Sequence, residues 1–130
     1  MAAIRVIIAD EFSDVRRQLV TRLHREPDFI IVGEARDNTQ ALKCTLNKRP
    51  DLLLIDPMMS DGLGMYTLQQ ITQQVPETAV VVLTTVADTA LRMELEKVGV
   101  KRVLTKCLDS DDMIAVLRQV AQNSRLLDNA

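Results

Sequence analysis

The stretch Asp51-Leu-Leu-Leu-Ile-Asp56 sets four consecutive apolar residues between two acidic ones. Similar short runs, rich in Val, Ile and Leu and without polar alternation, lie at residues 4–9, 29–34, 79–83 and 102–105. Continuous apolar runs are typical of strands buried on both faces of a parallel sheet. Buried helix segments are the alternative interpretation, and the shortness and β-branching of the runs disfavour it. The sequence therefore predicts five strands.

Amphipathic stretches separate the five runs. Apolar or small side chains recur there at helical spacing, in the groups Val15, Leu19 and Leu23; Ala41, Leu42, Thr45 and Leu46; Met65, Leu68, Ile71 and Val75; Leu91, Leu95 and Val98; and Met113, Leu117 and Val120. Ser13 is a candidate N-cap for the first group, and Gly99 is suited to end the fourth. Strands that alternate with helices predict an α/β fold, a doubly wound five-stranded parallel sheet with helices on both faces.

The bulk properties set limits on organisation and partners. We expect one domain over residues 1–130, with its core at about 4–121 and a short polar C-terminal tail. A formal net charge of -2 argues against nucleic-acid binding by this domain itself. Cys44 and Cys107 lack metal-ligand spacing, and no run approaches the roughly 20 apolar residues of a membrane span. These features favour a cytoplasmic protein with reduced thiols and no membrane contact.

Polar residues stand where four of the predicted strands end. They are Asp10 and Glu11 after the first, Asp56 after the third, Thr84 after the fourth and Lys106 after the fifth. Taken singly, each has a bland explanation, because acids and threonines cap helices and a lysine at a strand end is usually solvated. If the strand order is 2-1-3-4-5, however, the three carboxylates converge where the order reverses, which is where open α/β sheets bind ligands.

Such a group of carboxylates predicts a cation and a nucleophile. Mutual repulsion favours a bound hard cation, and Mg²⁺ prefers oxygen ligands and is usually held by one or two carboxylates plus a phosphate oxygen. An oxygen of Asp56 then remains free to attack phosphorus. Phosphoryl transfer needs in-line positioning and neutralised charge, which Lys106 and Thr84 could supply together with Mg²⁺. An acyl phosphate on aspartate is a known covalent intermediate.

Four segments together resemble the receiver domains of two-component response regulators, which share the flavodoxin-like fold. They are Ile-Ile-Ala-Asp10-Glu11, the segment from Asp51 to Gly64, Val-Val-Val-Leu-Thr84-Thr85 and Arg-Val-Leu-Thr-Lys106. Their order and separations are those of the family. Residues 30–35, Ile-Ile-Val-Gly-Glu-Ala, are in addition similar to the second strand of LuxR-type regulators.

The resemblance implies a role for each site residue. Asp56 would be the phosphoacceptor, and Thr84 and Lys106 would contact the phosphoryl group. Asp10, Glu11, Asp56 and the backbone carbonyl of Met58 would hold Mg²⁺. The partner would be a sensor histidine kinase, and a homodimer is compatible with the family. The chain would be no enzyme beyond its own phosphorylation and dephosphorylation. It would regulate transcription through a C-terminal DNA-binding domain that lies outside this chain.

Several residues depart from the family pattern. Pro57 follows the acceptor and lacks a backbone donor, which leaves the N–H of Met58 to serve. Ser60 stands where proline is usual, and Val103 stands where many members carry a Tyr or Phe. Cys107 follows Lys106 in place of proline or aspartate, and we predict a buried thiol there. The only histidine, His24, lies in an Arg-rich helical stretch and is expected to be exposed.

Two other functions are alternatives. A pseudo-receiver would share the fold but bind proteins without phosphorylation, and Pro57 and Val103 are the clues to it. The acid pair, Thr84 and Lys106 argue against that alternative. A phosphatase of the haloacid dehalogenase type would also use an aspartate at a strand end, but it carries Asp-x-Asp. Here Met58 is the second residue after Asp56, so the general acid is missing.

Overall fold

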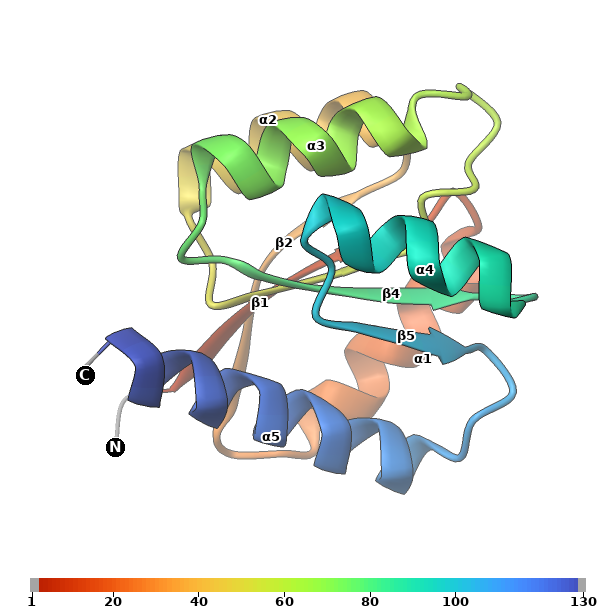
Figure 1. The fold of residues 1–130 in the computed structure, drawn as a ribbon. Helices are drawn as coiled ribbons and strands as arrows, with labels where there is room; N and C mark the ends of the chain where they lie inside the picture. The colour runs from red at the N-terminus through yellow and green to blue at the C-terminus, as the bar shows by residue number, and fades with distance from the viewer. Residues whose placement is uncertain (1–2, 129–130) are drawn as a thin grey trace.

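The computed structural model describes the backbone of residues 3–128 and the side chains of residues 3–125, and it shows five strands alternating with five helices (Figure 1). The elements in chain order are β1 (Ile4–Ala9), α1 (Ser13–His24), β2 (Phe29–Ala35), α2 (Asn38–Lys48), β3 (Leu52–Ile55), α3 (Gly64–Gln74), β4 (Ala79–Thr84), α4 (Thr89–Val98), β5 (Arg102–Thr105) and α5 (Ser110–Asp128). All strands are parallel, in the order β2-β1-β3-β4-β5. The predicted doubly wound fold is confirmed.

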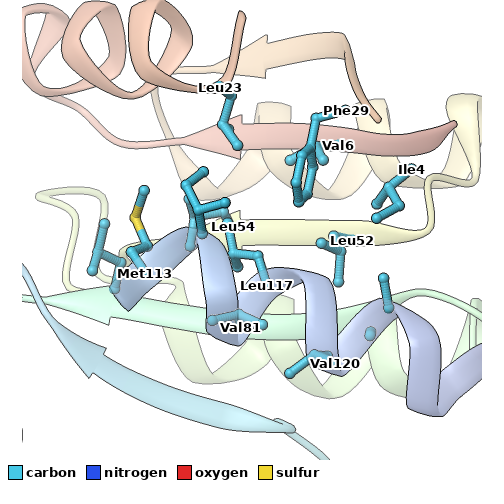
Figure 2. Close-up of a cluster of buried hydrophobic side chains, with 14 of the residues drawn as sticks. Ile4, Val6, Leu23, Phe29, Leu52, Leu54, Val81, Met113, Leu117 and Val120 are labelled. Atoms are coloured by element: carbon cyan, nitrogen blue, oxygen red, sulfur yellow. The ribbon is translucent and has the colours of Figure 1, made fainter. Parts of the chain in front are cut away.

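The apolar runs form strands because both faces of the sheet are covered. Side chains of β3 alternate between two cores, so that Leu54 packs with α1 and α5 while Leu53 packs with α2, α3 and α4. Figure 2 shows the first core, where Leu117 and Val120 of α5 lie over the sheet. Full burial of one such leucine side chain contributes about 1.5–3 kcal/mol. Two-sided burial explains why the runs show no polar alternation.

The helix boundaries confirm some capping predictions and correct one. Gly99 ends α4 with φ 110, a conformation that favours glycine. Ser13, the predicted N-cap of α1, is instead the first helical residue. Phe12 stands at the N-cap position without a side-chain cap, and its carbonyl accepts a hydrogen bond from the Arg16 N–H. The expected cap by the Ser13 hydroxyl is therefore absent. Instead, Asp10 Oδ1 accepts a hydrogen bond from the N–H of Phe12, the residue that directly precedes the helix.

The C-terminal tail is the second correction. Helix α5 continues through the predicted polar tail to Asp128, well beyond residue 121. The Arg125 guanidinium near its end donates to the carbonyl of Ala3 at 2.9 Å and lies 3.3 Å from Asp51 Oδ2. The helix continues here because Arg125 contacts the two residues that directly precede β1 and β3. No helix within residues 3–128 has the length and apolar content required to cross a membrane.

Candidate functional site

Parallel pairing brings the predicted site residues to one edge of the sheet. Ala9 of β1 is in register with Ile55 of β3, so the residues that follow them, Asp10 and Asp56, are neighbours. The Asp56 N–H donates to the Ala9 carbonyl at 3.0 Å. Asp10, Asp56 and Thr84 are all buried, with 2%, 7% and 3% of their surface exposed. Buried carboxylates at adjacent strand ends require a compensating positive charge.

The Lys106 ammonium supplies that charge. Its Nζ lies 2.7 Å from Asp10 Oδ2 and 2.7 Å from Asp56 Oδ2. Burial by itself lowers the pKa of Lys106, but the hydrogen bonds to Asp10 and Asp56 outweigh it, so that the pKa is raised above its ordinary value. The ring of Phe12 lies 5.6 Å from the same nitrogen, as in a cation–π contact. Three of the predicted residues therefore meet directly.

Backbone donors hold the other oxygens of the two aspartates. Asp10 Oδ1 accepts from the Phe12 N–H at 2.9 Å, and Asp56 Oδ1 accepts from the Met58 N–H at 3.0 Å. The Met58 N–H, the first backbone donor after Pro57, therefore binds the Asp56 carboxylate in this structure. Both carboxylates are fixed in orientation, and each directs Oδ2 toward Lys106.

Glu11 does not join this group. Its Oε2 accepts from the Ser60 hydroxyl at 2.8 Å and from the Ser60 N–H at 3.4 Å, which ties the β1–α1 loop to the β3–α3 loop. Within the described part of the chain, no three His, Cys, Asp or Glu residues are arranged to hold a metal ion. The expected convergence of three carboxylates is thus reduced to two, because Ser60 competes for the third.

The site still fits a magnesium ion by its donor chemistry. Asp10 and Asp56 offer carboxylate oxygens at one point, and Mg²⁺ commonly binds through one or two carboxylates and fills its octahedron with water and phosphate oxygens. A cation, the Lys106 ammonium, already lies between the two carboxylates. The two carboxylates thus face a positive charge in this structure, and their oxygens are donors of the kind that Mg²⁺ prefers.

The remaining predicted residues lie around this pair. Thr84 ends β4, and its carbonyl accepts from the Lys106 N–H at 2.8 Å, which places the two residues side by side. Val103 is buried in the core under α4. Cys107 is exposed, not buried as predicted, and its Sγ lies 3.2 Å from the Thr105 hydroxyl. His24 is exposed, as expected.

Sequence reasoning missed two arginines that fix the surrounding loops. Arg16 of α1 donates to the Asp10 carbonyl at 2.6 Å and so holds the end of β1. Arg92 of α4 donates to the Val103 carbonyl at 2.7 Å and to the Ala87 carbonyl at 3.2 Å. Both donate to backbone carbonyls, which carry no side-chain identity. A sequence pattern could not have found either contact.

Comparisons with known proteins agree with this geometry. The oxygen regulatory protein NreC of Staphylococcus epidermidis is 29% identical over 95% of this chain and 57% of that protein. The DNA-binding transcriptional activator DevR/DosR of Mycobacterium tuberculosis is 25% identical over 97% of this chain and 58% of that protein. The chain thus spans less than two thirds of the length of these relatives.

The solved structures extend the likeness to the fold. The signal receiver domain of NarL from Mycobacterium tuberculosis superposes with a TM-score of 0.88, covering 94% of this chain and 98% of that chain at 21% identity. The family described as the response regulator receiver domain matches residues 6–118, a range that begins within β1 and ends within α5. From the sheet order, the site and this match together, the chain belongs to the response regulator receiver domain family.

Proposed function

We propose that this domain is a phosphorylation-driven switch in which Asp56 accepts a phosphoryl group from a sensor histidine kinase. One observation carries the proposal: a single ammonium, that of Lys106, pairs with Asp56 and Asp10 at the carboxyl edge of the sheet. Asp56 directly follows β3, and backbone and lysine donors hold its buried carboxylate. Such a carboxylate is placed to act as a nucleophile toward an incoming phosphoryl group.

The transfer step follows from the chemistry of the groups. An oxygen of Asp56 attacks the phosphorus of a phosphohistidine, a P–O bond forms, and the P–N bond breaks with its electron pair going to the imidazole nitrogen. Lys106 contacts the attacking carboxylate and would pair with an oxygen of the transferred group, and Thr84, whose carbonyl accepts from the Lys106 N–H, would contribute its hydroxyl. Little else is required, because phosphoryl transfer depends mainly on positioning and charge neutralisation.

Magnesium would supply the remaining charge neutralisation at the phosphoryl oxygens when bound. Asp10, Asp56 and the Met58 carbonyl would hold it, with Glu11 as a further ligand once it leaves Ser60. The protein's own contribution is to bring Asp10 beside the acceptor and to fix the direction of both carboxylates through the N–H groups of Phe12 and Met58.

The process that this domain controls is proposed from the functions that the names of its relatives state. Two of them are named as an oxygen regulatory protein and a DNA-binding transcriptional activator, and both are longer than this chain. We therefore propose that the domain controls transcription in the cytoplasm through a DNA-binding domain of the LuxR type elsewhere in the protein. The domain itself has a formal net charge of -2 and therefore no excess of basic residues to contact DNA phosphates.

Intact-mass measurement tests the phosphoacceptor directly. Wild type and Asp56→Asn are incubated with Mg²⁺ and acetyl phosphate, and wild type alone should gain one phosphoryl mass. The matched control is Asp51→Asn, which changes an aspartate at the other end of the same strand. Labelling of Asp56→Asn would reject Asp56 as the acceptor. If neither acetyl phosphate nor any histidine kinase labels wild type, the domain is a pseudo-receiver.

A further inference from the structure

Asn38, the first residue of α2, is fully buried, and its hydrogen bonds link α2 to the β3–α3 loop. Its side-chain Nδ2 donates to the Pro57 carbonyl at 3.2 Å and to Asp61 Oδ1 at 2.7 Å. Its backbone N–H donates to Asp61 Oδ2 at 2.8 Å. Asn38 therefore holds the β3–α3 loop at two points, one of which is the residue directly after Asp56.

The contact with Pro57 acts on a peptide unit that also contacts Asp56. The Pro57 carbonyl and the Met58 N–H belong to the same planar group, and in the trans form they point in opposite directions. The carbonyl faces Asn38, and the N–H donates to Asp56 Oδ1 at 3.0 Å. Asn38 and Asp56 thus hold opposite sides of one peptide. Rotation of that peptide would break both hydrogen bonds.

Two neighbours restrict this peptide further. Pro57 has no N–H, so Met58 provides the first backbone donor after the acceptor. On the other side, a Cβ atom at Gly64 would lie 2.2 Å from the Pro57 oxygen, so only glycine leaves room for this carbonyl. The loop can therefore keep the peptide in this orientation only while Asn38 offers its amide and Gly64 has no side chain.

Asp61 fixes the Asn38 amide in turn. Its Oδ1 also accepts from the Leu63 N–H at 3.1 Å. Burial tends to raise the pKa of Asp61, but the hydrogen bonds from Asn38 and the neighbouring backbone lower it below its ordinary value. The carboxylate is consequently charged at neutral pH, and it lies at the N-terminus of α2, where the helix dipole favours negative charge.

We propose that Asn38 is a positioning residue for Asp56, which acts through the Pro57–Met58 peptide and is itself held by Asp61. This inference rests on the proposed function for its effect on reactivity. An amide whose carbonyl accepts a hydrogen bond is polarised and donates more strongly through its N–H. Asn38 thereby strengthens the donor that fixes Asp56 Oδ1 and keeps Oδ2 toward Lys106.

Packing alone does not explain an asparagine at this position. The Oδ1 atom of Asn38 is buried and has no hydrogen-bond partner in the described part of the chain. An alanine would remove this acceptor, but it would also leave the Pro57 carbonyl and Asp61 Oδ1 without their side-chain donor. The two contacts of Nδ2, and not packing, are therefore what this asparagine contributes to the loop beside the acceptor.

The test compares Asn38→Ala and Asp61→Ala with Thr45→Val. Thr45 is the matched control because it is also buried on α2 and its hydroxyl also lacks a partner among the described residues. Two quantities are measured in the full chain, the rate of phosphorylation by acetyl phosphate with Mg²⁺ and the hydrogen exchange of the Met58 amide. The rate should fall about tenfold in Asn38→Ala, because the Pro57 carbonyl loses the donor that holds its peptide against Asp56. The Met58 amide should exchange faster.

Asp61→Ala should move both quantities in the same direction, and Thr45→Val should leave both within about twofold of wild type. If Asn38→Ala does not fold, Asp61→Ala carries the test, because Asp61 is exposed. Folded variants with unchanged Met58 exchange and an unchanged rate would overturn the inference. Absence of phosphorylation in wild type would reject the proposed function, and the Met58 exchange would still show whether Asn38 holds the peptide.

Discussion

Lys106 balances the charge of two buried carboxylates, and its removal should affect stability as well as phosphorylation. Without the ammonium, Asp10 and Asp56 would face each other unpaired. We expect Lys106→Ala to lower the free energy of unfolding by about 2 kcal/mol at pH 7, less than for a fully buried pair because water reaches the site. Urea unfolding measures this change. Lys101→Ala, an exposed lysine beside the same strand, should change little.

The pH dependence has a definite sign. Because the pKa of Lys106 is raised in the folded protein, its contribution is fully present below the ordinary lysine value of about 10.4 and is lost as pH rises through the folded value. Wild-type stability should therefore fall in the alkaline range more steeply than that of Lys106→Ala. Parallel alkaline unfolding curves for the two proteins would contradict this assignment.

Ser60 holds Glu11 away from the aspartate pair, and this contact makes a prediction for magnesium. Ser60→Ala removes the hydroxyl that donates to Glu11 Oε2 at 2.8 Å. Because the freed carboxylate can then turn toward the ion, we expect magnesium affinity to rise by about three- to tenfold, the equivalent of one hydrogen bond. Calorimetry or magnesium-dependent thermal stability measures the affinity. In the background of Glu11→Gln the gain should disappear; a gain that persists there would mean that Ser60 acts in another way.

Arg92 joins α4 to the loop before it and to the strand after it. It donates to the Ala87 carbonyl in the β4–α4 loop and to the Val103 carbonyl on β5, the strand at the edge of the sheet. Val103 itself has a β-branched side chain with restricted χ1 freedom and no ring to turn. We therefore expect a signal from the site to travel through the loop at residues 84–88 and α4, with Arg92 carrying it to β5.

NMR spectra with and without beryllofluoride and Mg²⁺ test this route. In wild type, shifts should concentrate at residues 84–98 and near Lys106, while the Val103 methyls keep one rotamer. Arg92→Lys keeps the charge but loses the planar fork that reaches two carbonyls, so shifts at 102–105 should shrink and α4 amides should exchange faster. Arg17→Lys, at an exposed position of α1, is the control. A rotamer change at Val103 with a quiet α4 would contradict the route.

The bounds of the strands could be predicted from the sequence more closely than the ends of the helices. Strand bounds agree to within one residue, because two-sided burial leaves an uninterrupted apolar run such as 52–55. Helix ends are predicted less evenly. Gly99 ends α4 by a local rule, and α1 begins after a local turn in which Asp10 accepts from the Phe12 N–H. The extension of α5 beyond residue 121 instead involves contacts of Arg125 with Ala3 and Asp51, which lie far away in the sequence and which no local rule contains.

In the candidate site, some contacts could be predicted from the sequence and others could not. Asp10, Asp56 and Lys106 could be predicted to meet because parallel strands end at one edge, whatever the loops do. The Glu11–Ser60 contact spans 49 positions of the chain, and the Asn38–Asp61 contact spans 23. Such pairs depend on how two loops pack, and no periodicity in the sequence records that.

The site and the contacts of Arg125 lie at opposite ends of the sheet. Figure 1 shows the start of β1 and the last turn of α5 at the end of the sheet away from the loops that follow the strands. There Arg125 links α5 to Ala3 and Asp51, and Asp51 Oδ2 also accepts from the Arg5 N–H at 2.8 Å. This cluster joins the first strand, the third strand and the last helix. It should therefore contribute to stability without contributing to phosphorylation.

Truncation after residue 121 tests this separation. The shortened chain loses the last turns of α5 and the Arg125 contacts, so its free energy of unfolding should fall by about 2 kcal/mol, and that of Arg125→Ala by about 1 kcal/mol, because these partners are partly solvated. Urea unfolding gives both values, and truncation after residue 128 is the control. The rate of Asp56 phosphorylation by acetyl phosphate should stay within twofold of wild type in all three proteins, as long as each is measured below its unfolding transition. A large loss of the phosphorylation rate with unchanged stability would mean that the end of α5 affects the site. A purely structural contact at the other end of the sheet changes the fraction of folded protein, and it leaves the reactivity of the folded protein unchanged.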